Sequence, residues 1–265
     1  MNNPKISVIT ICFNAEKTLE ETILSVINQT YDNIEYIIID GASKDNTMDI
    51  VNKYRNRISI VISEPDKGIY DAMNKGIKLA SGDWINFMNA GDSFAGEDVV
   101  EKYISQIDPL TDIAYGDANM FFHSSVIVWK AFPIHCMKER MPFCHQTVFV
   151  RAKYHKENPF DISYRLAGDY NFFYKSYYEK HVNFQHIALI VANFDASDGL
   201  STVISLRLKE NARLKGTEKN VYWYIKYYIS ILVHYIKQFI KLFLPQSLIN
   251  RKKQKKLDQY SNNCI

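Results

Sequence analysis

The sequence has few cysteines, and their spacing matches no common cysteine motif. Its four cysteines form neither a CxxC pair nor a spacing typical of a zinc site: Cys12, Cys136, Cys144 and Cys264. This usage gives no sign of a disulfide framework or a cysteine-based metal centre, and it favours a reducing compartment.

A secretory signal and a membrane-spanning run are also missing. The N-terminus, MNNPKISVIT, has no basic region followed by an apolar segment and a small-residue cleavage site. In the apolar segment 221–245, the longest stretch without lysine is the ten residues 227–236, whereas a spanning helix needs about 20. We therefore expect a cytoplasmic protein with no membrane span.

Internal repeats and low-complexity blocks are absent as well. What remains is a chain of 265 residues, 47% hydrophobic and 23% charged, which suits one large domain or a domain with an appendage. Up to residue 88, patterns of buried strands alternate with helical patterns. Strands are expected at 6–13, 34–40, 58–63 and 84–88.

This alternation predicts an α/β fold with a mainly parallel central sheet and helices on both faces. Ligands of such sheets bind at the carboxyl ends of the strands. Polar residues stand at those ends in this sequence: Asn14, Asp40, Glu64, and the segment from Asn89 to Asp92. We therefore expect the functional site there.

The last quarter of the chain is a separate electrostatic unit. Residues 203–256 hold 13 Lys and Arg against two Glu, a charge of +11, so the rest carries −8 of the overall +3. The segment 221–245 is amphipathic, with its lysines on one helical face. Either this helix lies on a membrane, aided by the basic run 251–256, or it packs its apolar side on the main domain.

Three segments together resemble the N-terminal half of family 2 glycosyltransferases, which have the GT-A nucleotide-diphospho-sugar transferase fold. They are ISVITICFNAEKTLEETILSVINQTY, IEYIIIDGASKDNT and EPDKGIYDAMNKGIKLASGDWINFMNAGDSF. The third is similar to bacterial transferases of exopolysaccharide and O-antigen assembly. The resemblance implies a catalytic domain over 1–205, with a nucleotide-sugar half (1–120) and an acceptor half (121–205), followed by a tail of basic amphipathic helices (206–265).

The resemblance implies a divalent metal, Mn²⁺ or Mg²⁺, at Asp92. The family segment reads Asp-x-Asp or Asp-Asp, but here the preceding acid is replaced by Gly91. One carboxylate can suffice, because such ions usually take only one or two protein carboxylates and complete their shell with phosphate and water. We expect metal dependence with low metal affinity in the absence of nucleotide. The alternative is that Asp92 only shapes a turn or caps a helix.

For the nucleotide sugar, the family pattern Asp-Asp-Gly-Ser appears as Asp40-Gly41-Ala42-Ser43, so the second acid is missing. Asp40 is expected to contact the nucleotide or, alternatively, to cap the next helix. Glu64 and Asp66 are the candidates to contact ribose and uracil instead. The other candidates for the nucleotide-sugar site are Phe13 beside the base or else in the core, Lys67 at the diphosphate or else solvated, and Asn89.

A transferase also needs a base for the acceptor hydroxyl. In YRLAGDYNFFYK, Asp169 matches the family position of the catalytic base; its alternative role is to cap the helix. His145 and Gln146 resemble a His-Gln pair of this subfamily and are expected to contact acceptor or diphosphate, unless His145 is simply an interior histidine. The segment 193–202 is similar to a loop that closes over the site.

The resemblance, with these residues in the matching positions, implies an inverting glycosyltransferase. It would move a hexose or N-acetylhexosamine from a UDP-sugar to an acceptor, forming a β-glycosidic bond. The tail favours an acceptor on undecaprenyl diphosphate, GlcNAc or GalNAc, in O-antigen or lipopolysaccharide assembly at the cytoplasmic face of the inner membrane. The alternative is a nucleotide-sugar-binding scaffold subunit with weakened catalysis. No nucleic acid partner is expected. A sugar nucleotidyltransferase would need a Gly-rich basic loop, which ITICFNAEKTLEE does not provide.

Overall fold

The computed structural model describes residues 3–122, 125–195, 204–218 and 221–241. The predicted loop 193–202 therefore lies mostly outside the described residues. The basic run 251–256 lies outside them entirely.

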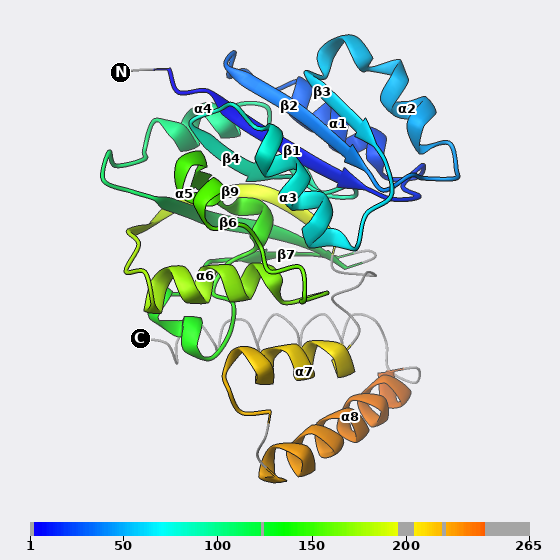
Figure 1. Ribbon diagram of the computed structural model, residues 1–265, viewed down its shortest axis with the longest axis vertical. Coiled ribbons are helices and arrows are strands. Elements are labelled where there is room, and N and C mark those ends of the chain that lie inside the picture. The colour runs from blue at the N-terminus through cyan, green and yellow to red at the C-terminus, as the bar shows by residue number, and fades with distance from the viewer. Residues whose placement is uncertain (1–2, 123–124, 196–203, 219–220, 242–265) are drawn as a thin grey trace.

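A mixed sheet forms the centre of the molecule (Figure 1). Within the described residues its order is β3-β2-β1-β4-β8-β6-β9-β5, with β7 paired to β6. The strands are β1 Ile6–Cys12, β2 Ile34–Asp40, β3 Ile60–Ser63, β4 Trp84–Phe87, β5 Ser93–Phe94, β6 Ile113–Phe122, β7 Ser125–Trp129, β8 Phe149–Arg151 and β9 Phe184–Asp195.

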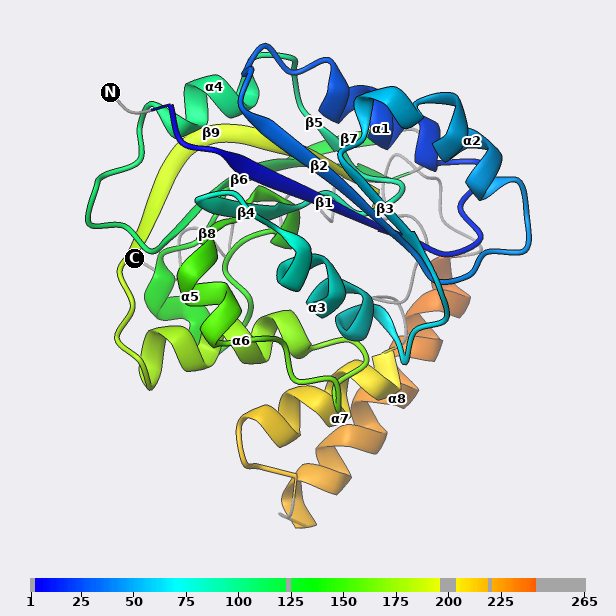
Figure 2. The same ribbon diagram turned by 45° about the horizontal axis from the view of Figure 1, so that its top comes forward.

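Helices cover both faces of this sheet. They are α1 Leu19–Ile27, α2 Thr47–Lys53, α3 Ile69–Leu79, α4 Val99–Ile104, α5 Ala152–Glu157 and α6 Gly168–Tyr178, with α7 Ile204–Leu214 and α8 Val221–Lys241 in the tail. Short 3₁₀ helices span Arg55–Arg57, Ile134–Lys138 and His145–Thr147. Figure 2 shows α3, α5 and α6 on one side of the sheet and α1, α2 and α4 on the other.

Alternation along β1 explains why both faces are covered. Ile9 and Ile11 point into the core shared with α3 and α6, whereas Ile6 and Val8 point into the core shared with α1 and α4. A strand with apolar residues at every position can be buried only between two layers of helices. The continuous run ISVITIC therefore becomes a central strand.

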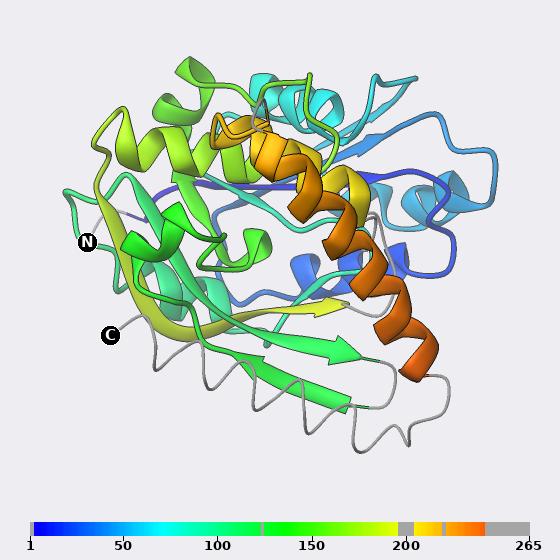
Figure 3. The same cartoon turned by 90° about the horizontal axis from the view of Figure 1, so that it is seen from below.

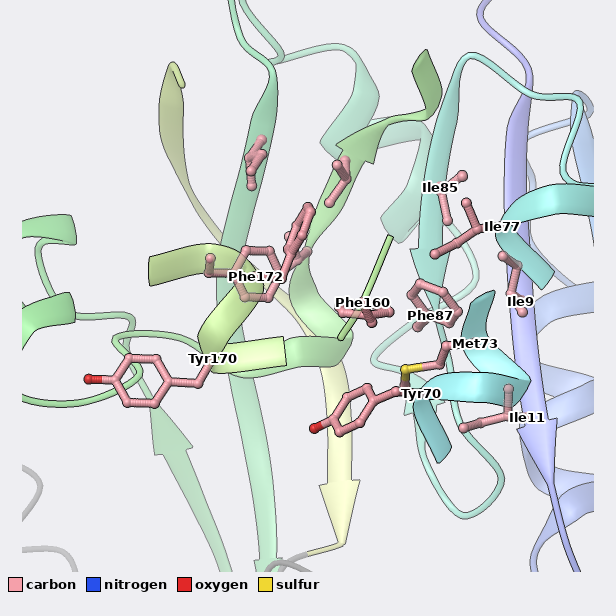
Figure 4. Packing of buried hydrophobic residues seen from close by; sticks show 14 of the residues in the cluster. Ile9, Ile11, Tyr70, Met73, Ile77, Ile85, Phe87, Phe160, Tyr170 and Phe172 are labelled. Carbon is pink, nitrogen blue, oxygen red and sulfur yellow. The ribbon is translucent and has the colours of Figure 1, made fainter. Parts of the chain in front are cut away.

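An aromatic cluster joins α3, β4 and α6 (Figure 4). The ring of Phe160 lies 5.5 Å from that of Tyr70, 5.8 Å from Phe87 and 5.3 Å from Phe172, measured between centroids. These tilted and edge-on contacts are favourable arrangements of aromatic rings. They hold the N-terminal end of α6 against α3, which matters for the site.

The predicted α/β fold class is confirmed, and the sheet corrects one detail of it. The pairs among β1, β2, β3 and β4 are parallel, as expected. In the second half β8 runs antiparallel to β4 and β6, and β7 runs antiparallel to β6. The sheet is therefore mixed: β6 and β7 form an antiparallel hairpin, whereas the parallel pair of β6 and β9 is joined through the segment that carries α5 and α6.

The tail helix α8 exposes its apolar side. Figure 3 shows α8 in front of α7 on the lower side of the molecule. A stripe of large apolar side chains, spaced by three or four residues, is exposed: Ile225, Ile229, Leu232, Ile236 and Phe239. Among the described residues no helix is long and apolar enough to span a bilayer. The alternative in which the broad apolar side packs on the main domain does not match this arrangement.

Candidate active site

Two neighbouring cavities open at the carboxyl ends of β1 and β4. The first cavity has a volume of about 710 Å³ and the second about 610 Å³. They share one wall, formed by Thr18, Ile69, Asn89 and Ala90. A ligand with two chemically different parts could therefore extend from one cavity into the other.

Phe13 and Asp66 line the first cavity, together with Asn14 and Gly41. The Phe13 side chain is 62% exposed, so its alternative place in the core is wrong. A Cβ atom added to Gly41 would lie only 2.6 Å from Asp66 Oδ2. The Asp66 carboxylate thus stands where the acid of the family pattern would begin. An acidic side chain at residue 41 would therefore clash with the Asp66 carboxylate where it now lies.

Asp40 does not reach either cavity. It is fully buried (0% exposed), and its carboxylate accepts hydrogen bonds from Ser43 N (3.1 Å) and Ser63 Oγ (2.6 Å). Because these contacts tie β2 to β3 and to the following turn, Asp40 shapes the wall without lining it. A direct contact between Asp40 and the nucleotide stays a prediction, and it would require the hydrogen bonds from Ser43 and Ser63 to break.

Glu64 and Lys67 are exposed and do not line the two cavities. Glu64 instead forms an ion pair with Lys75 (2.9 Å). Asn89 lies on the shared wall, and its buried Oδ1 has no hydrogen-bond partner among the described residues. Of these three predicted residues, only Asn89 is positioned to meet a ligand in this conformation.

Asp92 lies on the wall of the second cavity, where it is only 7% exposed. Gln146 Nε2 donates a 2.6 Å hydrogen bond to Asp92 Oδ2, and Cys144 Sγ donates to Gln146 Oε1 (2.8 Å), which fixes the amide orientation. Burial raises the pKa of Asp92 to about 7, against the lowering effect of the Gln146 hydrogen bond. Asp92 is thus a buried acid whose charged form is disfavoured mainly by its burial.

The backbone explains why Gly91 precedes this acid. Gly91 has φ +97°, a conformation that side chains rarely adopt, and its N–H donates to Thr22 Oγ1 (3.0 Å). An acid at this position would strain the turn that brings Asp92 to the cavity. The missing partner of the family pattern is therefore a consequence of this local conformation.

A second carboxylate, which the sequence reasoning missed, lies beside Asp92. Asp195, the last residue of β9, lines the same cavity; its backbone hydrogen bonds to Asp92, and its charge helps raise the pKa of Asp92. Its segment, NFDASDG, was expected only as a loop. Pairing of β9 with β5 puts Asp195 beside Asp92, and that long-range contact left no local signal.

Asp169 also lines the second cavity, near the start of α6. Its Oδ1 accepts hydrogen bonds from Tyr70 Oη (3.0 Å) and from the backbone N–H of Tyr170 (2.8 Å). Its Oδ2 lies 3.6 Å from His145 Nδ1. Oδ1 is therefore held by the protein. The Asp169 side chain is 23% exposed, so Oδ2 can contact a ligand in the cavity.

His145 lines the same cavity, with its side chain 10% exposed. Burial lowers the pKa of His145, and the charge of Asp169 offsets only part of this effect, so the ring is neutral near pH 7. Neither ring nitrogen has a hydrogen-bond partner among the described residues. His145 is thus largely interior and packs beside Phe87, with 5.5 Å between ring centroids. Its contact with acceptor or diphosphate stays a prediction.

The remaining wall of the second cavity is apolar and aromatic. It includes Trp129, whose buried Nε1 lacks a partner among the described residues, with Met141, Phe143, Leu166 and Phe194. Flat apolar faces with a few polar groups suit a sugar ring. The sequence offered no signal for Trp129, which comes from the irregular middle of the chain.

Comparison with known proteins identifies the family. A family model described as Glycosyl transferase family 2 matches residues 7–177. The chain belongs to this family. A PGL/p-HBAD biosynthesis glycosyltransferase of Mycobacterium bovis is 30% identical over 212 residues, covering 77% of this chain and 82% of that protein. An uncharacterized glycosyltransferase of Haemophilus influenzae is 38% identical over 108 residues, covering 40% of this chain and 43% of that protein. The protein is accordingly a glycosyltransferase.

Solved structures show the same GT-A-like fold. S. aureus TarS 1-349 in complex with UDP-GlcNAc aligns with a TM-score of 0.65 at 20% identity, covering 81% of this chain. The present chain covers 66% of that TarS chain. The mannosyltransferase PcManGT from Pyrobaculum calidifontis, in complex with GDP-Man and Mn²⁺, aligns with a TM-score of 0.61 at 11% identity, covering 97% and 85% of the two chains.

The residues present in this family 2 glycosyltransferase fit a divalent cation. Asp92 and Asp195 offer oxygen ligands on one cavity, and hard cations such as Mn²⁺ and Mg²⁺ prefer oxygen. Within the described residues no three His, Cys, Asp or Glu side chains cluster as a metal site. Any metal would therefore depend on ligand phosphate and water for the rest of its shell.

Proposed function

We propose that the protein is an inverting glycosyltransferase that moves a hexose or N-acetylhexosamine from a UDP-sugar to an acceptor sugar, forming a β-glycosidic bond. One observation carries the proposal. Asp169, a carboxylate with one oxygen held by Tyr70 and Tyr170, lines the same cavity as Asp92, and this cavity shares a wall with the cavity of Phe13 and Asp66.

The first cavity is proposed to hold the nucleotide. Phe13 offers an exposed aromatic face on which a base can stack, and Asp66 offers a carboxylate for the base or ribose, in place of the acid missing at 41. Asn89 on the shared wall would then meet the diphosphate or the donor sugar. The likeness to TarS in complex with UDP-GlcNAc supports a UDP-sugar as donor.

The Asp92 side of the second cavity is proposed to receive the diphosphate. Asp92 and Asp195 would hold Mn²⁺ or Mg²⁺, and Gln146 keeps the Asp92 carboxylate in place. Such an ion, when bound, stabilises the negative charge of a departing nucleoside diphosphate as a Lewis acid. Burial raises the pKa of Asp92, and a cation bound there would stabilise the charged form of its carboxylate.

The Asp169 side is proposed to receive the acceptor. The second oxygen of Asp169 would take the proton of the acceptor hydroxyl while the hydroxyl oxygen attacks the anomeric carbon and the bond between that carbon and the diphosphate breaks. A single displacement inverts the anomeric centre. Neutral His145, 3.6 Å from Asp169, can hydrogen bond to the acceptor or the diphosphate, and Trp129 offers an aromatic face and an N–H donor.

The test of this function is transfer from a panel of donors: UDP-GlcNAc, UDP-GalNAc, UDP-glucose, UDP-galactose and GDP-mannose. The acceptor is a synthetic lipid diphosphate carrying GlcNAc or GalNAc, with Mn²⁺ or a chelator. We expect sugar transfer from a UDP-sugar, and we expect this transfer to require the metal. Transfer from GDP-mannose alone would contradict the UDP assignment, and full activity in the chelator would contradict the metal.

We further propose that α8 places the protein on the cytoplasmic face of the inner membrane, where an acceptor on undecaprenyl diphosphate is presented during O-antigen assembly. The exposed stripe of Ile225, Ile229, Leu232, Ile236 and Phe239 supports this, because an amphipathic helix buries such a face at the lipid interface. Exposed lysines of the same helix, Lys226 and Lys237, would favour anionic lipid.

Introducing charge into this stripe is expected to release the protein from membranes. The double variant Ile229→Glu/Leu232→Glu should reduce flotation with anionic phosphatidylglycerol vesicles by about tenfold or more, because two charges would enter the lipid interface. Leu110→Glu is the matched control, since Leu110 is 77% exposed on another part of the surface. Unchanged flotation of the α8 variant would remove the membrane from the proposal.

A further inference from the structure

The Glu210 carboxylate is buried although it belongs to the tail helix α7. It is only 7% exposed and accepts three backbone hydrogen bonds, from Arg165 N (2.7 Å), Leu166 N (2.8 Å) and Ala167 N (2.8 Å). Hydrogen bonds to an ionised acceptor are stronger than those between neutral groups. Three consecutive N–H groups therefore converge on one charged side chain from a different helix.

These three residues lead directly into α6, which carries Asp169. Ala167 stands at the N-cap of α6 and has no side chain that could cap the helix. The N-terminal end of a helix is electropositive and favours a nearby negative charge. Glu210, from α7, supplies that charge at Ala167, two residues before Asp169. Arg165 and Leu166 themselves line the second cavity.

A second side chain of α7 grips the same loop. Arg213 Nη2 donates to Ser163 Oγ (2.8 Å), and its guanidinium lies 4.5 Å from the centroid of the Tyr164 ring. Together Glu210 and Arg213 contact the loop from residue 163 to 167. Figures 1 and 2 show α7 beside the end of α6 and between α6 and α8.

We propose that Glu210 is a positioning residue for sugar transfer: by holding the N–H groups of residues 165–167, it fixes the direction in which Asp169 enters the cavity. The inference rests on the proposed function, because it acts through Asp169 as base. It also makes α7 part of the acceptor side of the site, although its sequence reads as the start of the basic tail.

The test compares Glu210→Gln with Glu218→Gln. Glu218 is the other glutamate of the tail; its charge acts on Tyr164, but among the described residues it makes no hydrogen bond to the backbone of 165–167. A glutamine at 210 keeps one acceptor oxygen but presents an NH₂ group to the converging N–H donors. We expect kcat to fall on the order of 10- to 100-fold, because a small misplacement of a reacting group lowers the rate by such factors. KM for the donor and the Kd of UDP should stay within about twofold, since the first cavity is not touched. Glu218→Gln should match the wild type.

The double variant Asp169→Asn/Glu210→Gln separates positioning from general damage. If Glu210 acts through Asp169, the double variant transfers sugar as slowly as Asp169→Asn alone, whereas independent effects would multiply. A further drop in the double variant, or a wild-type kcat in Glu210→Gln, would overturn the inference. A wild-type rate in Asp169→Asn would instead overturn the proposed function.

Discussion

Replacing Asp169 by Asn is expected to lower kcat for sugar transfer by about 10³-fold, within the range of 10²–10⁴ that a general base contributes. The amide can still accept the hydrogen bond from Tyr70 Oη that the Asp169 carboxylate accepts now (3.0 Å), so the local structure should persist. It cannot take a proton from an acceptor hydroxyl. The measurement is initial rate with saturating donor and acceptor, beside UDP binding by calorimetry.

Tyr70→Phe is the matched comparison. It removes the hydrogen bond to Asp169 Oδ1 and leaves the second oxygen untouched, so the rate should fall far less than in Asp169→Asn. The Kd of UDP should be unchanged in both variants. Loss of transfer with intact UDP binding in Asp169→Asn would exclude the scaffold alternative. Retained transfer in that variant would show that Asp169 is not the base.

Replacing Asp92 by Asn is expected to lower metal-dependent transfer by about 100-fold or more, because a Lewis acid contributes several kcal/mol. Asn can still accept the hydrogen bond from Gln146 Nε2 (2.6 Å to Asp92 Oδ2). Since burial raises the pKa of Asp92 to about 7, its surroundings accommodate a neutral side chain and the fold should tolerate the substitution. Binding of Mn²⁺, followed by electron paramagnetic resonance with and without UDP, is the direct measurement.

In the wild type, Mn²⁺ binding should be weak alone and strengthen with UDP, and Asp92→Asn should abolish this gain. Asp195→Asn should weaken the binding of Mn²⁺ in the presence of UDP. Tight binding without UDP, or binding that survives both substitutions, would show that the ion is held elsewhere.

The first half of the fold could be predicted because its signals are local. The run IEYIIID became β2 at the residues expected, 34–40, and helical segments alternate with the strands up to β4. Strands buried on both faces are continuous in apolar residues, and this pattern survives in one sequence. Polar residues at strand ends then indicate the ligand edge, and Asn89 and Asp92 do line cavities there.

The rest of the site depends on contacts between distant segments. Asp195 lies beside Asp92 through β-strand pairing, and Glu210 reaches the loop before α6 from about 45 residues away along the chain. Asp40 shows the opposite case: it stands at a strand end, but Ser43 and Ser63 take up its carboxylate. A residue at the right edge of a sheet is not thereby exposed to a ligand.

The two glycines that replace family acids have structural reasons. At 41 an added Cβ would lie 2.6 Å from Asp66 Oδ2, so the Asp66 side chain would have to move, and at 91 the backbone has a positive φ. In both places a carboxylate from another segment faces the same cavity, Asp66 in the first and Asp195 in the second. The acidic pairs that the sequence lacks are thus replaced in space, which is why the departures do not by themselves argue for lost catalysis.

The anomeric configuration of the product tests the central claim most directly. Proton nuclear magnetic resonance of the disaccharide formed from an α-linked UDP-sugar gives this configuration through the coupling at the anomeric carbon. A single displacement with Asp169 as base predicts a β-glycoside and no α product. An α-glycoside would mean retention of configuration and would contradict the mechanism proposed for this site.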